Sequence, residues 1–276
     1  MKILLELAYD GAGYNGWQSQ ASRKHITVQE VVEDALEKVS HQRIRTLASG
    51  RTDAGVHALC QPVQFITNST IPPERYKQAL NSHLPEDIRV LKSRQVSENF
   101  HAIASVCTKT YLYRILRTED PDVFRRKRIW HFAYALSMDS MRQAATLLQG
   151  THDFRAFCSS RTDAKSFVRT VQEVSVEHCG DEVHIRVTGN GFLHNMVRIM
   201  VGTITEIGQG RMTLASLESA LSTGCRTQAG PTAPAAGLYL ESVLYDPAVL
   251  QVNPDRNEGT SESRGNECQT NRKTNL

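Results

Sequence analysis

The sequence lacks several patterns that mark common classes of site. Its six cysteines include no Cys-x-x-Cys pair, and no two of its ten histidines are four residues apart, which excludes a zinc site of the usual kind. No Gly-rich phosphate-binding run follows an expected strand, so nothing supports a nucleotide cofactor. We therefore expect no metal and no cofactor. The cysteines are expected to be reduced core thiols, except Cys268 in the polar tail.

Long apolar runs and a strong excess of one charge are missing as well. No stretch approaches the roughly 18 apolar residues that cross a bilayer. Residues 1–11 contain no signal-peptide pattern, so they predict a first strand in a cytoplasmic protein that has no membrane association. Lys and Arg total 32 against 29 Asp and Glu, and this net charge of +3 is too small to indicate a nucleic-acid partner alone.

What is present is the composition of a folded protein. The 276 residues are 40% hydrophobic and 22% charged, which excludes disordered, collagen-like and disulfide-scaffold classes and allows one large domain or two medium ones. Residues 246–276 lose apolar periodicity and are rich in Ser, Asn, Glu and Gly. We expect them to form a flexible polar tail outside the fold.

The first half of the fold, residues 1–103, alternates strands and helices. Thr27 and Glu30 form a capping box, and apolar residues then recur with helical spacing. Pro73 opens a second helix. The expected elements are a strand 2–9, a helix 28–39, strands 43–48 and 59–67, a helix 73–83 and a strand near 88–91.

The second half, residues 104–245, repeats this order. The expected strands are 105–117, 168–179, 182–190 and 237–245, and the expected helices are 137–149, 193–207 and 213–222. Each half therefore has the order β-α-β-β-α-β, with one extra helix in the second half, and this order is typical of ferredoxin-like and RNA-recognition folds. We predict an α+β fold of two such halves that share a mainly antiparallel sheet, with helices on one side and a central cleft.

The densest candidate site is the run 49–58, between two expected strands. It combines Arg51, Asp53 and an imidazole with two glycines that allow close approach to a ligand. A carboxylate beside a guanidinium stays ionised and can act as a nucleophile or base. The alternative is a tight loop with an Asp cap and a surface Arg.

A second candidate lies on the strand 105–117. Alternation places Lys109, Tyr111 and Tyr113 on one face, where an aromatic ring beside a cation can stack a base. The alternative is that the tyrosines belong to the core. The basic run 125–128 follows; it fits either a phosphate backbone or a solvated loop.

A third candidate is the run 189–198, which turns from a strand into an apolar helix. Arg198 lies in this helix, where a guanidinium needs an acidic partner or a phosphate. The Gly-rich run 10–17 fits either backbone shaping near a polynucleotide or simple turns, because it lacks the Lys of a phosphate-binding loop.

Taken together, these residues resemble the TruA-type tRNA pseudouridine synthases. The pieces occur in the order of that family and extend over most of the chain. They are residues 9–11, 16–18, 50–58, 100–102, 111–113, 152–154, 189–193, 196–198, 202–203 and 237–240.

The resemblance implies isomerisation of uridine to pseudouridine at positions 38, 39 and 40 of the tRNA anticodon stem-loop, without metal or cofactor. It implies that Asp53 is the catalytic carboxylate, that Tyr111 lies against the uracil and that Arg198 pairs with Asp53. It also implies that Arg51 holds the RNA with the target nucleotide flipped out and that Leu238 lines the base pocket. The expected partners are tRNA and a second copy of the chain.

The sequence departs from the family pattern at three places. Ile103 stands where the family usually has Arg, and Lys109 could supply that contact. Pro62 suggests an edge or a bulge in its strand. The run 159–164 echoes the run around Asp53, but we expect it to be a surface loop. Two rival classes stay open: an RNA-binding relative without activity, and a carboxylate-dependent nucleoside or glycoside hydrolase.

Overall fold

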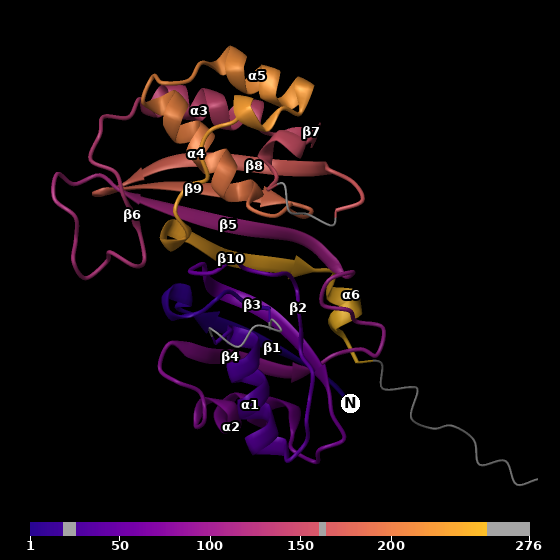
Figure 1. Cartoon of the computed structure of the whole chain (residues 1–276). Helices are drawn as coiled ribbons and strands as arrows, with labels where there is room; N and C mark the ends of the chain where they lie inside the picture. Colours follow the sequence, from indigo (N-terminus) through magenta and orange to yellow (C-terminus); the bar gives the residue numbers. More distant parts are fainter. Residues whose placement is uncertain (19–25, 160–163, 253–276) are drawn as a thin grey trace, which may run out of the picture.

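The computed structural model describes residues 1–18, 26–159 and 164–252, and in them ten strands form one sheet (Figure 1). The order is β4-β1-β3-β10-β5-β9-β8-β7, with β2 paired to β3 and β6 paired to β5. Only β10–β3 and β5–β6 are parallel among the pairs in this described sheet. The protein is a mixed α+β fold with a large, mostly antiparallel sheet.

The strands and helices follow one another along the chain as follows. The strands are β1 Lys2–Tyr9, β2 Leu47–Ala48, β3 His57–Ile66, β4 Ile88–Gln95, β5 Val106–Leu116, β6 Trp130–His131, β7 Gly150–Asp153, β8 Val168–Cys179, β9 Glu182–Gly189 and β10 Leu238–Tyr245. The helices are α1 Val28–Ser40, α2 Tyr76–Asn81, α3 Met138–Leu147, α4 Met196–Gly208, α5 Leu214–Thr223 and α6 Pro247–Leu250. No helix of this part of the chain is long and apolar enough to cross a membrane.

Side-chain caps fix where several helices begin. The Thr27 hydroxyl accepts a bond from Glu30 N, and the Glu30 carboxylate accepts one from Thr27 N, so the predicted capping box is present. Ser137 and Thr213 cap α3 and α5 in the same way. α4 differs, because Asn195 precedes it in the left-handed region at φ +62°.

Two hydrophobic clusters cover the same face of the sheet. The N-terminal cluster joins β1 and β3 to α1 and α2, and the C-terminal cluster joins β5, β8 and β9 to α3, α4 and α5. On β10, Leu240 belongs to the first and Leu238 to the second, and residues two apart in a strand point to one face. Tyr111 packs against both clusters, so it lies where the two clusters meet.

Most helices and the longer strands agree with the sequence-based ranges, and the remaining elements differ. The expected strand 43–48 contracts to β2, because Thr46 N donates to Glu33 Oε1 of α1 at 2.9 Å instead of joining a ladder. The expected helix 73–83 splits into a 3₁₀ turn, Pro73–Arg75, and the short α2. The strands β6 and β7 were not predicted at all.

Two further expectations differ from the structure. Residues 247–250, expected to be tail, form α6, whose Val249 and Leu250 pack against a small cluster around Phe100. Residues 253–276 and Cys268 lie outside the described residues. Of the other five cysteines only Cys158 is buried, so most of them are not core thiols.

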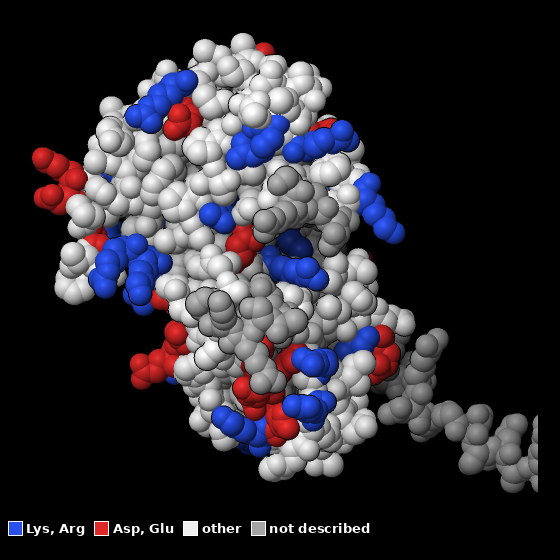
Figure 2. Space-filling view, in the orientation of Figure 1, with Lys and Arg blue, Asp and Glu red and all other residues white. Residues whose placement is uncertain are grey.

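The loop between β5 and β6, residues 117–129, is tied down by ion pairs. Glu182 Oε1 accepts from Arg114 at 2.6 Å and from Arg125 at 2.9 Å, and Arg125 also pairs with Asp122 and Asp181. Figure 2 shows Lys and Arg side chains over this loop, at the left of the view, close to acidic ones.

The basic run 125–128 is therefore not a cluster of four free cations. Arg125 is neutralised by the carboxylates just named, and Arg128 Nε lies 2.6 Å from Asp10 Oδ2. These contacts hold the loop on the sheet instead of leaving the guanidinium groups available to a phosphate backbone.

We predict that Glu182→Gln lowers the free energy of unfolding by roughly 1–3 kcal/mol, because two guanidinium groups lose their shared carboxylate. Glu37→Gln is the matched control, since Glu37 and its partner Arg43 are exposed, and we expect a change within about 0.5 kcal/mol. Denaturant unfolding of both variants measures the difference. Equal losses in the two variants would contradict a structural role for the Glu182 network.

Candidate active site

The loop between β2 and β3 carries Asp53 and is held by contacts at its neighbours. The Thr52 hydroxyl lies 2.8 Å from the Tyr9 hydroxyl, and Trp17 N donates to Thr52 O at 3.1 Å. Val56 N donates to Asp53 O at 3.1 Å, closing a turn in which Gly55 has φ +78°, a conformation that favours glycine. These bonds fix the backbone on both sides of the Asp53 carboxylate.

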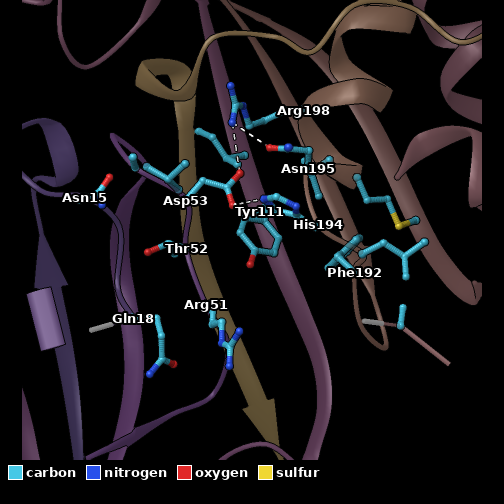
Figure 3. A pocket seen from close by; sticks show the side chains of 17 residues that line it. Asn15, Gln18, Arg51, Thr52, Asp53, Tyr111, Phe192, His194, Asn195 and Arg198 are labelled. Carbon is cyan, nitrogen blue, oxygen red and sulfur yellow. Dashed lines mark hydrogen bonds and ion pairs between the residues drawn. The ribbon is translucent and has the colours of Figure 1, made fainter. Parts of the chain in front are cut away.

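Two side chains from the start of α4 face this carboxylate (Figure 3). Arg198 Nη1 donates to Asp53 Oδ2 at 3.1 Å, and His194 Nε2 lies 3.4 Å from Asp53 Oδ1. Arg198 is itself oriented, because its Nε donates to Ala233 O and its Nη1 to Asn195 Oδ1. The guanidinium that the sequence places in an apolar helix thus has its acidic partner.

The two candidate tyrosines of β5 have different surroundings. Tyr113 is fully buried in the core, and its hydroxyl donates to Pro234 O at 2.7 Å. The Tyr111 ring packs edge-on against Phe192 at 5.2 Å, and its hydroxyl makes no hydrogen bond to any described residue. Burial, together with the nearby Asp53 charge, raises the pKa of Tyr111 well above its ordinary value, so its phenol is neutral at pH 7.

These groups line a cavity of about 670 Å³ beside the junction of the two clusters. All five site residues expected from the sequence lie in its wall: Arg51, Asp53, Tyr111, Arg198 and Leu238. Figure 3 shows the Asp53 carboxylate between Arg198 and His194, while Arg51 points away from it. Among the described lining residues Asp53 is the sole carboxylate. The cavity combines one anionic group, an aromatic wall and a free guanidinium, which suits a planar base on a charged backbone.

The sequence reasoning missed several lining residues. His194, Asn195 and Phe192 lie in the run 189–198, whose apolar helix drew attention only to Arg198. Asn15 and Gln18 come from the Gly-rich run near the N-terminus, and nothing in their spacing predicts that they face Asp53. The left-handed φ of Asn195, for which Asn is the usual non-glycine residue, was the one available signal.

Two other candidates can be placed against this site. No group of three or more His, Cys, Asp or Glu that could hold a metal occurs in the described ranges. The second run, 159–164, includes Asp163, and residues 160–163 lie outside the described residues. Ile103 is half exposed on a turn, and Lys109 points to the loop before Asp53, where its Nζ donates to Ser49 O.

His57 lies behind the loop, on the opposite face of the sheet. Gly11 N donates to its Nδ1 at 3.1 Å, so this nitrogen carries no proton, although Asp10 Oδ1 lies 3.0 Å from it. The ring stacks on Tyr239 at 4.6 Å. Burial lowers the pKa of His57, and Asp10 opposes this only in part. The imidazole is therefore neutral in the folded protein.

We predict that His57 makes folding less stable in acid. Because its folded pKa lies below the unfolded value of about 6.5, stability is complete above that pH and falls as the unfolded chain takes up a proton below it. At pH 8 the free energy of unfolding of His57→Gln should be lower than that of the parent protein. This difference should be smaller at pH 5. Urea unfolding across this range measures it. A difference that grows on acidification would instead indicate a charged His57 paired with Asp10.

Comparisons with known proteins agree with this arrangement. A profile described as tRNA pseudouridine synthase matches residues 7–103 and 144–246. The tRNA pseudouridine synthase A of Bacillus pumilus is 44% identical over 248 residues, covering 89% of this chain and 100% of the relative. That of Moorella thermoacetica is 45% identical over 243 residues, covering 88% and 99%.

A solved Cbf5-Nop10-Gar1 complex aligns with a TM-score of 0.33 and 13% identity, covering 74% of this chain and 45% of that chain, which is too distant to carry an argument. The family profile and the close relatives cover nearly all of residues 7–246, including every residue whose side chain faces Asp53. The chain therefore belongs to the tRNA pseudouridine synthase family.

Proposed function

We propose that the protein converts uridine to pseudouridine at positions 38, 39 and 40 of the tRNA anticodon stem-loop, with Asp53 as the catalytic carboxylate. The observation that carries this proposal is the Asp53 carboxylate fixed between Arg198 and His194 in a cavity walled by Tyr111. Family membership supports tRNA as the substrate. The positions within tRNA follow from the resemblance of the motifs.

The chemistry needs few groups. The glycosidic bond between C1′ and N1 breaks, the base turns, and a bond between C1′ and C5 forms while the C5 proton is lost and N1 gains one. No oxidant or energy source is consumed. A fixed carboxylate can stabilise positive charge at C1′ or attack it, as carboxylates do in glycoside hydrolysis. Arg198 holds the Asp53 carboxylate in place, because its Nη1 donates to Asp53 Oδ2 while its Nε is fixed on Ala233 O.

The target base must leave its stack, which costs a few kcal/mol. Tyr111 and Leu238 offer the flipped uracil an aromatic and an aliphatic wall. Arg51 is exposed and makes no ion pair with a described residue, so its guanidinium is available to hold the displaced RNA backbone. We assign base binding to the first two residues and base flipping to the third.

The geometry disfavours the two rival classes. A glycoside or nucleoside hydrolase of the two-carboxylate type needs a second acid within about 5–9.5 Å, and Asp53 is the only carboxylate among the described residues that line the cavity. A relative that only binds RNA has no need to fix a carboxylate on both oxygens. Incubation with unmodified tRNA separates the three, which yield pseudouridine, free uracil or no product.

We also infer that residues 1–103 and 104–245 are two ferredoxin-like units. The strand orders β4-β1-β3-β2 and β10-β5-β9-β8 support this, because both follow the 4-1-3-2 order within β-α-β-β-α-β. We further propose a homodimer in the cytoplasm, where one tRNA contacts both subunits. The resemblance to the family supports this assembly, and measuring the mass of the free protein and of its tRNA complex tests it.

We predict that Asp53→Asn abolishes pseudouridine formation while tRNA is still bound, because the neutral amide cannot act as a nucleophile. Asp163→Asn, in the echoed run, is the matched control and should stay within a few-fold of the parent. Both variants are assayed on the same unmodified tRNA, with modified positions mapped along the anticodon stem-loop. An active Asp53→Asn variant or an inactive Asp163→Asn variant contradicts the assignment of Asp53 as the catalytic carboxylate. Pseudouridine at other places in the tRNA contradicts the proposed positions 38, 39 and 40.

We predict that Tyr111→Phe keeps the fold and the affinity for tRNA but lowers turnover by about 10²–10⁴-fold, the range typical of a lost proton-transfer group. The reason is that the Tyr111 hydroxyl is neutral and has no hydrogen-bond partner among the described residues, which leaves it free for the substrate. Single-turnover rates at saturating enzyme measure the effect. Full activity of the Phe variant restricts Tyr111 to stacking.

A further inference from the structure

Lys109 is a half-buried cation beside the active site that the mechanism above does not use. It lies on β5 two residues before Tyr111, so both side chains point to the helix-covered face, about 6.6 Å apart along the strand. Its Nζ donates to Ser49 O at 2.7 Å. Lys109 thus contacts the beginning of the loop that carries Arg51 and Asp53.

The ammonium of Lys109 is poorly compensated. It makes no ion pair with any Asp or Glu in residues 1–18, 26–159 and 164–252, and the Ser49 carbonyl occupies one of its three donors. Burial, with no carboxylate to oppose it, lowers the pKa of Lys109 to about 8. A charge held this way in a folded protein costs free energy unless an anion joins it.

The neighbouring backbone is shaped to leave room for this group. A Cβ on Gly50 would lie 2.8 Å from Lys109 Nζ, so the glycine lets the ammonium sit against the loop. The next residue, Arg51, lines the cavity and is itself free of ion pairs with described residues. The Lys109 ammonium and the Arg51 guanidinium are therefore two cations beside Gly50 that make no ion pair with a described residue.

We propose that Lys109 Nζ binds a phosphodiester oxygen of the RNA strand that carries the target uridine. The proposal rests on tRNA being the substrate. A phosphate fits better than a base edge, because an ammonium is a point charge that recognises anions without strict geometry. It fits better than a carboxylate because the substrate strand carries one phosphate per nucleotide and binds next to Arg51. Lys109 then fixes the phosphate while Arg51 holds the strand.

The first test is Lys109→Met, which keeps the length of the side chain and removes its charge. We expect Kd for unmodified tRNA to rise roughly tenfold, as for other hydrogen bonds to charged groups. The slope of log Kd against log salt should fall by about 0.7–0.9, the value for one lost phosphate contact. The single-turnover rate at saturation should stay within a few-fold of the parent. Lys109→Arg, which keeps the charge, should retain the salt slope.

Two other variants separate a phosphate contact from a structural one. Gly50→Ala keeps the Lys109 charge, and its Cβ would lie 2.8 Å from Nζ, so only the flexible end of the lysine has to shift. It should therefore retain the salt slope of the parent. If Lys109→Met fails to fold, Lys109→Gln, which is polar but uncharged, should show the same weaker binding and smaller slope. Lys92→Met is the matched control, because Lys92 is exposed on β4 opposite Glu6, on the other face of the sheet. It should change neither quantity.

The outcomes are distinct. An unchanged Kd and salt slope in Lys109→Met, or in Lys109→Gln where the Met variant does not fold, overturns the proposal. A lower saturated rate with unchanged Kd also overturns it, because Lys109 then only positions the loop. In an Arg51→Met background, loss of the Lys109 effect shows action through Arg51 and overturns direct contact. A parent protein that makes no pseudouridine but shows the binding effects refutes the proposed function alone.

Discussion

The arrangement of the site depends on one ion pair between segments that are 145 residues apart in the chain. Asp53 comes from a loop of the N-terminal part, and Arg198 comes from α4 in the C-terminal part. The Arg198 guanidinium orients the Asp53 carboxylate and compensates its charge in the partly buried cavity. The rest of the fold brings these two groups together. The sheet runs unbroken from β4 to β7 because β10 pairs in parallel with β3, and both clusters pack on one face around Tyr111.

Much of the fold could be predicted from the sequence because it depends on local patterns. The capping box located α1 and apolar periodicity located α3 and α5, since a Thr before an apolar stripe has a direct physical reason to begin a helix. The failures fell where a tertiary contact replaced a local one. Thr46 satisfies its backbone with the Glu33 carboxylate and not with a strand neighbour, and α6 forms because Phe100 and its neighbours cover it.

The residues of the candidate site also divide into those that local sequence predicts and those that depend on tertiary contacts. Asp53, Arg51 and Tyr111 stood out because polar groups between glycines or beside an aromatic strand residue have few structural reasons to be there. His194 did not stand out, because its role depends only on where α4 starts relative to the loop. The basic run 125–128 was ambiguous for the opposite reason. A count of cations ignores the Asp181 and Glu182 carboxylates that pair with Arg125 and the Asp10 carboxylate that pairs with Arg128.

The parallel junction of β3 and β10 consists of two residue pairs, His57 with Tyr239 and Ala58 with Leu240. Asp53 belongs to the N-terminal side of this short junction and Arg198 to the C-terminal side. Their ion pair therefore also links the parts of the chain that form the two hydrophobic clusters. An esterified or protonated carboxylate has no net charge, and the coulombic attraction between Asp53 and Arg198 is then lost. By thermodynamic linkage, any step that changes the charge of Asp53 also changes the interaction free energy between the N-terminal and C-terminal parts of the fold.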